Sequence, residues 1–244
     1  MFHSLYPDLL KTKQEIYSDN FIYKAPPGAI IMLVEPRSIM PDVYEYVENN
    51  IDKFQLIYSF DSKLLQYDKT RLLIYGTVDL WSNEPKTKTV SMACSNKEYC
   101  DGHKIRKAIA NKLKGKIDTY GRFDGGEFVN SYDIYAPYMF NIAIENYKGG
   151  YYFTEKICNC FATKTIPIYF GSDCIADYFN SDGIIYINDL NKFWDEIDDI
   201  DWSNTEMFKK EYYKRLDAIN DNYERVKQFS NFNETFHRMY GGNA

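Results

Sequence analysis

The sequence predicts an α/β protein of two lobes, each with a parallel sheet covered by helices, followed by a helical C-terminal segment. Short apolar runs bounded by turn residues recur along the chain, and segments with helical spacing alternate with them. A polar, proline-containing stretch separates an earlier set of runs from a later set. These observations predict an N-terminal lobe over 1–85, a C-terminal lobe over 90–190, and helices over 191–244 that pack across both.

The first lobe is predicted from four segments and a linker. Three apolar runs are typical of buried strands, namely GAIIMLVEP (28–36), FQLIYSFD (54–61) and RLLIYG (71–76). MPDVYEYVENNI (40–51) has helical spacing after a proline start. WSNEPKTKT (81–89) is polar and is the expected linker.

The second lobe repeats the alternation with longer elements. Its predicted strands are TVSMACSN (89–96), IDTYG (117–121), YMFNIAIEN (138–146), TIPIYFG (165–171) and GIIYIND (183–189). Its predicted helices are GHKIRKAIANKLKG (102–115), which ends in glycine, and FTEKICNCFATK (153–164). RFDGGEFVN (122–130) is expected to be a loop.

The composition is that of a globular protein and narrows its partners. The 244 residues are 45% hydrophobic and 26% charged, and the formal net charge is −6. A broad nucleic-acid surface would need a basic face, which the sequence lacks, so no nucleic-acid partner is expected. An anionic ligand remains compatible with this charge where a few lysines and arginines converge.

No secretory or membrane-spanning signal is expected. MFHSLYPDLLKTKQ (1–14) lacks an apolar core of signal-peptide length, and no apolar run approaches the length of a transmembrane helix. Segment 206–240 mixes aromatic and basic residues at helical spacing. It could touch a membrane surface, but packing between the lobes is the expectation.

The cysteines indicate reduced thiols rather than a disulfide framework. There are five, and Cys158 and Cys160 lie two apart on a predicted helix, where their side chains diverge. Cys94, Cys100 and His103 could hold a metal, but no fourth ligand is evident. Asp199-Ile-Asp201 (199–201) resembles an Asp-x-Asp metal motif but follows no strand, so no metal site is predicted.

The start of the FTEK helix poses an electrostatic question. Thr154 fits the N-cap position, and Glu155 suits the positive end of the helix dipole, whereas Lys156 does not. Either Lys156 points into water, or its ammonium joins the free helix amides around a phosphate. Arg106, early in the preceding predicted helix, would be a second cation, and two convergent cations fit a diphosphate.

Polar residues follow the predicted strands at the edge where ligands bind in open α/β sheets. Glu145 and Asn146 follow one strand, Ser95 and Asn96 (95–96) another, and Glu35 follows the first-lobe run IIMLV. Each could equally be a turn former.

Two stretches resemble the α-1,3/α-1,4-fucosyltransferases of glycosyltransferase family 10. IAIENYKGGYYFTEKICNCFATKTIPIYFGS (142–172) is similar to the family signature, and SNKEYCDGHKIR (95–106) is similar to its Ser-Asn followed by a helix arginine. The resemblance covers about 90–190, and the first 85 residues are shorter than the usual acceptor lobe. It implies a GT-B-like architecture of two Rossmann-like lobes with a reduced N-terminal acceptor lobe. It also implies transfer of L-fucose from GDP-β-L-fucose to a glycan hydroxyl with inversion.

The resemblance also assigns donor-binding residues. Arg106 and Lys156 would hold the diphosphate, and Glu155 would bind the ribose hydroxyls. Asn146 and Tyr152 would add hydrogen bonds around the phosphates or the fucose. Glu145 belongs to the same pattern, with a structural role facing the helix layer as the alternative.

The resemblance to the family also implies a catalytic base in the first lobe, after a strand. Glu35 is the candidate, although Val34-Glu35-Pro36 (34–36) departs from the Gly-Glu-Asn of the family. A turn residue paired with Arg37 is its alternative reading, and Asp61 is the second candidate for the base.

Three functions remain open from the sequence: a fucosyltransferase, a transferase of another GDP- or UDP-hexose, and a non-catalytic nucleotide-sugar or glycan-binding module. No cofactor is expected beyond the GDP-sugar donor, and stimulation by a divalent metal is left open. The expected partner is a glycan acceptor with a galactose- or N-acetylglucosamine-type hydroxyl. The expected location is the cytoplasm of a bacterium or a virus-infected host cell. The oligomeric state and the linkage formed are not predicted.

Overall fold

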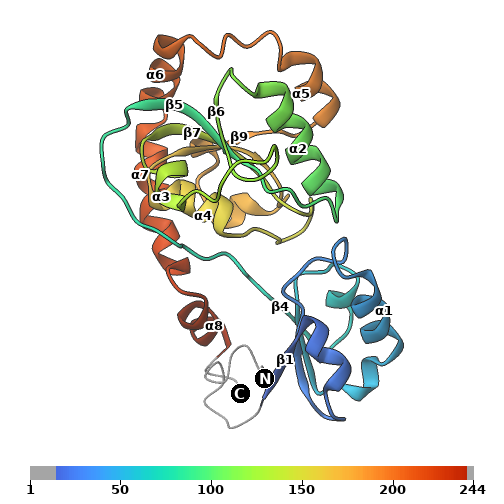
Figure 1. The fold of residues 1–244 in the computed structure, drawn as a ribbon. Coiled ribbons are helices and arrows are strands. Elements are labelled where there is room, and N and C mark those ends of the chain that lie inside the picture. The colour runs from blue at the N-terminus through green and yellow to red at the C-terminus, as the bar shows by residue number, and fades with distance from the viewer. Residues whose placement is uncertain (1–14, 241–244) are drawn as a thin grey trace.

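The computed structural model describes residues 15–240, which form two lobes, each built on a parallel sheet (Figure 1). The first sheet has the order β1–β2–β3–β4, with strands Ile16–Ser18, Ile30–Met32, Leu56–Ser59 and Thr70–Leu72. The second has the order β6–β5–β7–β8–β9, with β5 Lys88–Ala93, β6 Asp118–Tyr120, β7 Tyr138–Ile144, β8 Ile166–Phe170 and β9 Ile185–Tyr186. All pairings are parallel, as predicted, while the short strand β1 was not predicted.

Helices cover the sheets and form the C-terminal part of the chain. They are α1 Pro41–Asn49, α2 Asp101–Leu113, α3 Ser131–Tyr135, α4 Glu155–Ala162, α5 Leu190–Glu196, α6 Thr205–Lys214, α7 Leu216–Val226 and α8 Phe232–Tyr240. Pro41 occupies the first turn of α1, where its missing N–H costs no hydrogen bond. Helices α1, α2 and α4 lie where the sequence predicts them; α3 falls outside the predicted elements.

The second sheet is buried on both faces, which explains the continuous apolar sequence of its central strand. Every residue of β7 is buried. Phe140, Ile142 and Ile144 pack on the side of α2 and α6, whereas Ala143 packs with Ile157 of α4 on the other side. Strands covered on both faces do not need polar residues at alternate positions, so their sequences show no period of two.

The order of the second sheet creates a switch point between β5 and β7. The chain leaves β5 for its neighbour β6 on one side and then crosses back to β7 on the other side of β5. The two connections therefore diverge at the carboxyl ends of β5 and β7. Open α/β sheets bind ligands in the crevice that such a divergence leaves.

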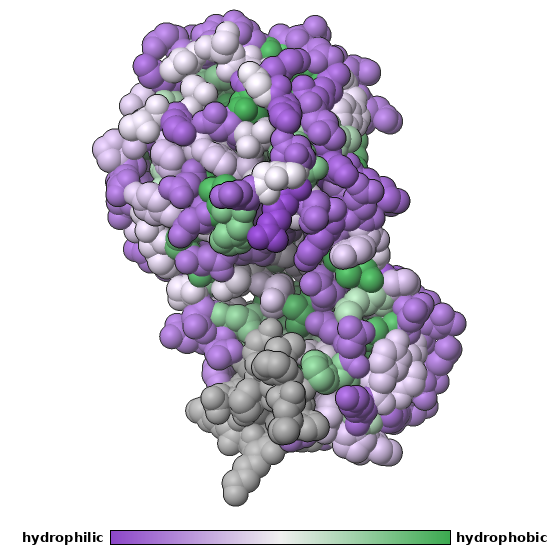
Figure 2. Space-filling model, in the orientation of Figure 1, coloured by the Kyte–Doolittle hydropathy of each residue, from purple (hydrophilic) through white to green (hydrophobic). Residues whose placement is uncertain are grey.

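The first sheet is covered on one face by its own helix and on the other by distant parts of the chain. Ile31 packs with Val43 of α1, whereas Ile30 packs in a cluster with Tyr152 and Phe236. The rings of Phe236 and Tyr58 lie 4.7 Å apart between centroids. The prediction that C-terminal helices pack across the lobes is therefore confirmed. Figure 2 shows hydrophobic residues at the constriction where the lobes meet.

The connection between the lobes is longer than the predicted linker. Residues 73–87 contain neither helix nor strand, because β4 ends at Leu72, the second residue of RLLIYG, rather than at the end of that run. The connection runs along the second lobe beside α7 (Figure 1), where Asn83 donates to the Tyr223 hydroxyl at 3.0 Å. Lys86 Nζ donates to Ala136 O at 2.8 Å and to Thr165 Oγ1 at 2.9 Å, so this segment is fastened to the lobe.

Within residues 15–240, no helix combines the length and the apolar character needed to cross a membrane. The N-terminal stretch 1–14, on which the expectation of no secretory signal rests, lies outside the described residues.

The packing of Phe236 predicts how strongly α8 stabilises the protein. Phe236→Ala removes a ring that is 2% exposed, and we expect it to lower the free energy of unfolding by about 3–5 kcal/mol, as buried Phe truncations do. Urea denaturation followed by circular dichroism measures this. Met239→Ala, at an exposed position of the same helix, is the control and should change it by less than about 0.5 kcal/mol. Equal effects of the two variants would contradict the packing of α8 on the first sheet.

Candidate functional site

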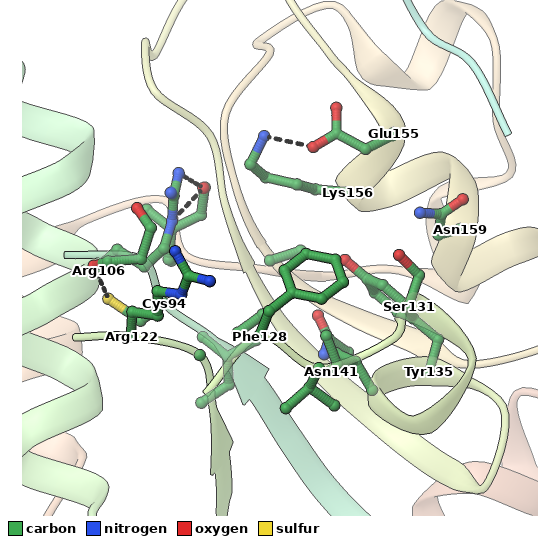
Figure 3. Close-up of a pocket in the computed structure, with 18 of the residues that line it drawn as sticks. Cys94, Arg106, Arg122, Phe128, Ser131, Tyr135, Asn141, Glu155, Lys156 and Asn159 are labelled. Atoms are coloured by element: carbon green, nitrogen blue, oxygen red, sulfur yellow. Dashed lines mark hydrogen bonds and ion pairs between the residues drawn. The ribbon is translucent and has the colours of Figure 1, made fainter. Parts of the chain in front are cut away.

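A cavity of about 450 Å³ lies at the switch point of the second sheet, a volume typical of small-molecule sites. Its walls come from residues 93–97 after β5, from residues 141–144 of β7, from segment 121–135, and from α2 and α4. Figure 3 shows Phe128 projecting into the space between the two arginines Arg106 and Arg122 and the start of α4.

The charge of the cavity wall is opposite to that of the chain. Its cationic side chains are Lys97, Arg106, Arg122 and Lys156, and its carboxylates are Asp79 and Glu155. Four cations against two carboxylates give a local excess of positive charge in a chain whose net charge is −6. A concave wall of this kind raises the local concentration of anions, so the cavity suits an anionic ligand.

Lys156 lies at the cavity wall and is held by two carboxylates. Its Nζ is 3.0 Å from Glu155 Oε1 and 3.4 Å from Glu145 Oε2, and its side chain is 18% exposed. Burial by itself would lower the pKa of Lys156, but Glu155 and Glu145 together raise it. The ammonium is therefore charged at the positive end of α4 and does not simply point into water, which leaves it able to meet an anion there.

The buried side chain of Glu145 holds the first turn of α4 in place. Its side chain is fully buried, and its carboxylate accepts hydrogen bonds from Thr154 N at 2.9 Å and from Thr154 Oγ1 at 2.8 Å. Thr154 is the N-cap of α4 and accepts from Lys156 N. Burial raises the pKa of Glu145, although Lys156 opposes this. These contacts give Glu145 a structural role, which the sequence analysis offered as the alternative to ligand binding.

Arg106 reaches the cavity from the opposite helix in a fixed orientation. Its Nε and Nη2 donate to Ile144 O at 3.1 and 2.5 Å, and Nη2 also donates to Asn146 Oδ1 at 2.8 Å. No residue among 15–240 accepts from Nη1, so part of the guanidinium is available to a ligand. Asn146 does not line the cavity, so its amide orients Arg106 and does not itself meet the cavity.

Glu155 lines the cavity beside Lys156. Burial would raise its pKa, but Lys156 lowers it, so the carboxylate is ionised and able to accept hydrogen bonds from hydroxyls. Its side chain remains 36% exposed.

Tyr152 does not line the cavity. Its side chain is buried in the first-lobe cluster, with its ring 4.7 Å from that of Phe60 between centroids. Burial, followed by the charges of Glu145 and Glu35, raises the pKa of its hydroxyl well above the ordinary range. Tyr152 therefore joins the lobes, and its hydroxyl lies within electrostatic reach of carboxylates from both.

Glu35 follows β2 at the carboxyl end of the first sheet, and its backbone is fixed from two sides. Asp19 Oδ1 accepts from Val34 N at 2.9 Å and from Glu35 N at 3.2 Å, and the Tyr44 hydroxyl donates to Glu35 O at 2.9 Å. The pairing of Glu35 with Arg37, its alternative reading, does not occur, because Asp61 and Glu48 bind Arg37 instead. Glu35 does not line the cavity, but its charge contributes to the raised pKa of the Tyr152 hydroxyl.

The carboxylate of Asp61 accepts hydrogen bonds from a neighbouring arginine and from two backbone N–H groups. Arg37 donates to both of its carboxylate oxygens, at 3.0 and 2.9 Å, and the backbone N–H groups of Lys63 and Leu64 donate to Oδ1. Burial would raise the pKa of Asp61, but these donors lower it. A carboxylate saturated in this way is a poor proton acceptor.

Several residues of the cavity were missed by sequence reasoning. Arg122 and Phe128 lie in a loop that carried no motif, and Phe128 is 80% exposed despite its size. Asp79 and Asn159 also line the cavity, and they hydrogen-bond to each other. The combination of charged and aromatic residues in the predicted loop RFDGGEFVN could have indicated Arg122 and Phe128 from the sequence.

The described part of the chain contains no group of three potential metal ligands of the His, Cys, Asp or Glu type. Cys94, Cys100 and His103 are therefore not assembled as a site, and the five cysteines are free. Asp201 Oδ1 instead accepts from the hydroxyl and N–H of Ser203 in a local turn.

Comparisons with known proteins identify the family to which this chain is similar. The family model described as glycosyltransferase family 10 (fucosyltransferase), C-terminal part, matches residues 83–236. An alpha-(1,3)-fucosyltransferase of Helicobacter pylori is 37% identical over 76 residues, which are 31% of this chain and 16% of that protein. The matched segment thus spans only a small part of that relative's length.

Solved structures resemble most of the chain in fold. A crystal structure of alpha1,3-fucosyltransferase with GDP has a TM-score of 0.57 and 20% identity, covering 96% of this chain and 79% of that one. A crystal structure of alpha1,3-fucosyltransferase with GDP-fucose has a TM-score of 0.52 and 20% identity, covering 86% and 74%. At this identity the likeness concerns the fold, and it confirms the predicted GT-B-like architecture. Because the family model covers more than half of the chain, the protein belongs to glycosyltransferase family 10, the fucosyltransferase family.

Proposed function

We propose that this protein transfers L-fucose from GDP-β-L-fucose to a hydroxyl of a glycan, with inversion at the anomeric carbon. The observation that carries the proposal is the meeting of Arg106 and Lys156 in one cavity at the amino end of α4. Family membership and the fold shared with a GDP-fucose complex of an alpha1,3-fucosyltransferase support the choice of donor.

The diphosphate would bind where helix amides, Lys156 and Arg106 converge. When the bond between the anomeric carbon and the β-phosphate oxygen breaks, its electron pair remains on GDP and the sugar becomes oxocarbenium-like. Fixed cations stabilise this developing negative charge more than they stabilise the bound donor. Glu155 would accept hydrogen bonds from the ribose hydroxyls, because its carboxylate is ionised and borders the same cavity.

Glu35 would be the general base for the acceptor. The acceptor hydroxyl oxygen attacks the anomeric carbon on the face opposite to GDP, and its proton passes to the Glu35 carboxylate. The rigid backbone at Glu35, held by Asp19 and Tyr44, suits this role, because a base must lie within hydrogen-bond reach of the proton that it takes. The acceptor would be a glycan with a galactose- or N-acetylglucosamine-type hydroxyl.

The contribution of Lys156 is testable by GDP binding. We expect Lys156→Gln to weaken GDP binding by about 10- to 100-fold, because one charge-assisted contact is worth about 1.5–3 kcal/mol. Glutamine keeps a donor for the buried Glu145, so the fold should survive. Isothermal titration calorimetry measures the affinity, with Lys104→Ala as the control, since Lys104 is exposed and does not line the cavity. Unchanged affinity in Lys156→Gln would refute the diphosphate site.

The role of Glu35 is testable by separating turnover from binding. We expect Glu35→Gln to lower kcat for fucose transfer by about 10²- to 10⁴-fold, the usual contribution of a general base, while GDP binding stays unchanged. Release of GDP from GDP-fucose or GDP-mannose, and of UDP from UDP-galactose, with lactose or N-acetyllactosamine as acceptor, measures this. Glu45→Gln, on the exposed face of α1, is the control. Full turnover in Glu35→Gln would show that Glu35 is not the base. Faster transfer from GDP-mannose or UDP-galactose than from GDP-fucose would show that fucose is not the transferred sugar.

The role of Asp61 predicts a stability effect instead. We expect Asp61→Asn to lower the free energy of unfolding at pH 7 by about 1–3 kcal/mol and to leave kcat per folded molecule unchanged. Because the folded pKa of Asp61 is lowered below its unfolded value of about 3.9, its stabilisation is present above that pH and is lost as the pH falls through the folded pKa. The difference between the variant and the wild type in urea denaturation should therefore shrink below about pH 4. A large loss of kcat with normal stability would instead identify Asp61 as the base.

A further inference from the structure

We propose that Asp79, in the connection between the lobes, recognises the base of the nucleotide and selects guanine. The proposal rests on the proposed function, in which the cavity binds a nucleoside diphosphate through Lys156 and Arg106. It assigns a specificity role to a residue outside both sheets and outside every motif of the sequence.

Asp79 is held at the cavity wall by a buried partner. Asp79 N donates to Asn159 Oδ1 at 2.9 Å, and Asn159 Nδ2 donates to Asp79 Oδ2 at 3.2 Å. Asn159 is 1% exposed and lies on α4, so it is a rigid support. Both residues line the cavity. The carboxylate is therefore held in one orientation, as a residue that recognises a ligand must be.

One oxygen of this carboxylate, at the wall of a ligand-sized cavity, has no partner in the described chain. Asp79 Oδ1 has no hydrogen-bond partner among residues 15–240. The only other carboxylate of the cavity wall, within the described chain, is Glu155, which is paired with Lys156. The side chains next to Asp79 in the chain, Val78 and Leu80, pack in the same apolar cluster as Ile134. The cavity that Asp79 lines also has the apolar side chains of Val129 and Ile134 in its wall, which suit a flat ring.

The spacing along α4 agrees with the dimensions of a nucleotide. Lys156 and Glu155 begin the helix, and Asn159 lies four residues after Glu155. At about 1.5 Å per residue, this places the Asn159–Asp79 pair about 6 Å along the helix from the proposed ribose contact. A nucleotide whose diphosphate meets the helix start and whose ribose meets Glu155 would bring its base to Asp79.

Guanine is the base that a carboxylate recognises best at this place. Its N1–H and exocyclic N2–H donate side by side from one edge, and a carboxylate accepts both. Adenine presents an acceptor at N1 beside its amino group, and uracil flanks its single N3–H with two carbonyl oxygens. Both would turn acceptor atoms toward the Asp79 carboxylate, which costs affinity.

Nucleotide binding to the wild type and Asp79→Asn tests this role. Asparagine keeps an oxygen for Asn159 Nδ2 and leaves the backbone contact intact, so the connection should stay in place. We expect Asp79→Asn to bind GDP about 10- to 100-fold more weakly, as loss of a bidentate base contact does. ADP and UDP should bind no more weakly than to the wild type, because the asparagine amide relieves the repulsion of their acceptor atoms. We also expect Asp79→Asn to bind xanthosine diphosphate more tightly than the wild type, because the asparagine amide can donate to the xanthine 2-carbonyl. This gain cannot come from unfolding.

The controls separate this proposal from the diphosphate site. Glu84→Gln changes an exposed carboxylate in the same connection that does not line the cavity, and it should bind every nucleotide like the wild type. Inosine diphosphate, which lacks the N2 amino group, should bind the wild type more weakly than GDP. If the wild type binds GDP, ADP and UDP equally in a Lys156-dependent way, Asp79 does not read the base although the diphosphate site stands. If no nucleotide binding depends on Lys156, both proposals fail.

Discussion

The buried carboxylate of Glu145 is the constraint on which the arrangement of the site depends. A charge with no exposure must be compensated by donors, and here Thr154 and Lys156 supply them. Through these contacts with Glu145, the N-cap Thr154 is fixed and the ammonium of Lys156 is held at the first turn of α4. The cation that opposes the helix dipole is thus held in place before any ligand arrives, so little reorganisation is needed to bind an anion.

The two lobes are linked by more than the connecting chain. The first sheet has one helix of its own, and its other face is covered by Tyr152 from the FTEK turn and by Phe236 from α8. Because Tyr152 is two residues before the N-cap Thr154, the loop that leads into α4 also packs against Phe60. Packing that buries apolar surface therefore sets the position of the first-lobe carboxylates relative to the cavity.

The carboxylates of the first lobe differ in role because they differ in partners. Asp61 receives two contacts from Arg37 and two backbone donors, which stabilise its ionised form. Asp19 is half-buried at a positive φ, and the loss of hydration raises its pKa to about 6 while it accepts from the backbone of Glu35. Glu35 is left with a fixed backbone and a carboxylate free of ion pairs to any of residues 15–240, the combination that a proton acceptor needs.

The sequence by itself determined the elements and the charged turn of this protein. Continuous apolar runs predicted β5, β7 and β8, because strands covered on both faces need no polar positions. The Thr-Glu-Lys order predicted an anion site with Arg106, because helix capping and dipole effects are local. Only the tertiary structure decided which strand-end residues reach the cavity. Asn146 turns to Arg106 and Tyr152 to the first lobe, while Arg122, Phe128 and Asp79 enter from loops. A position at a strand end fixes the edge of the sheet but not the direction of the side chain, which packing between distant segments sets.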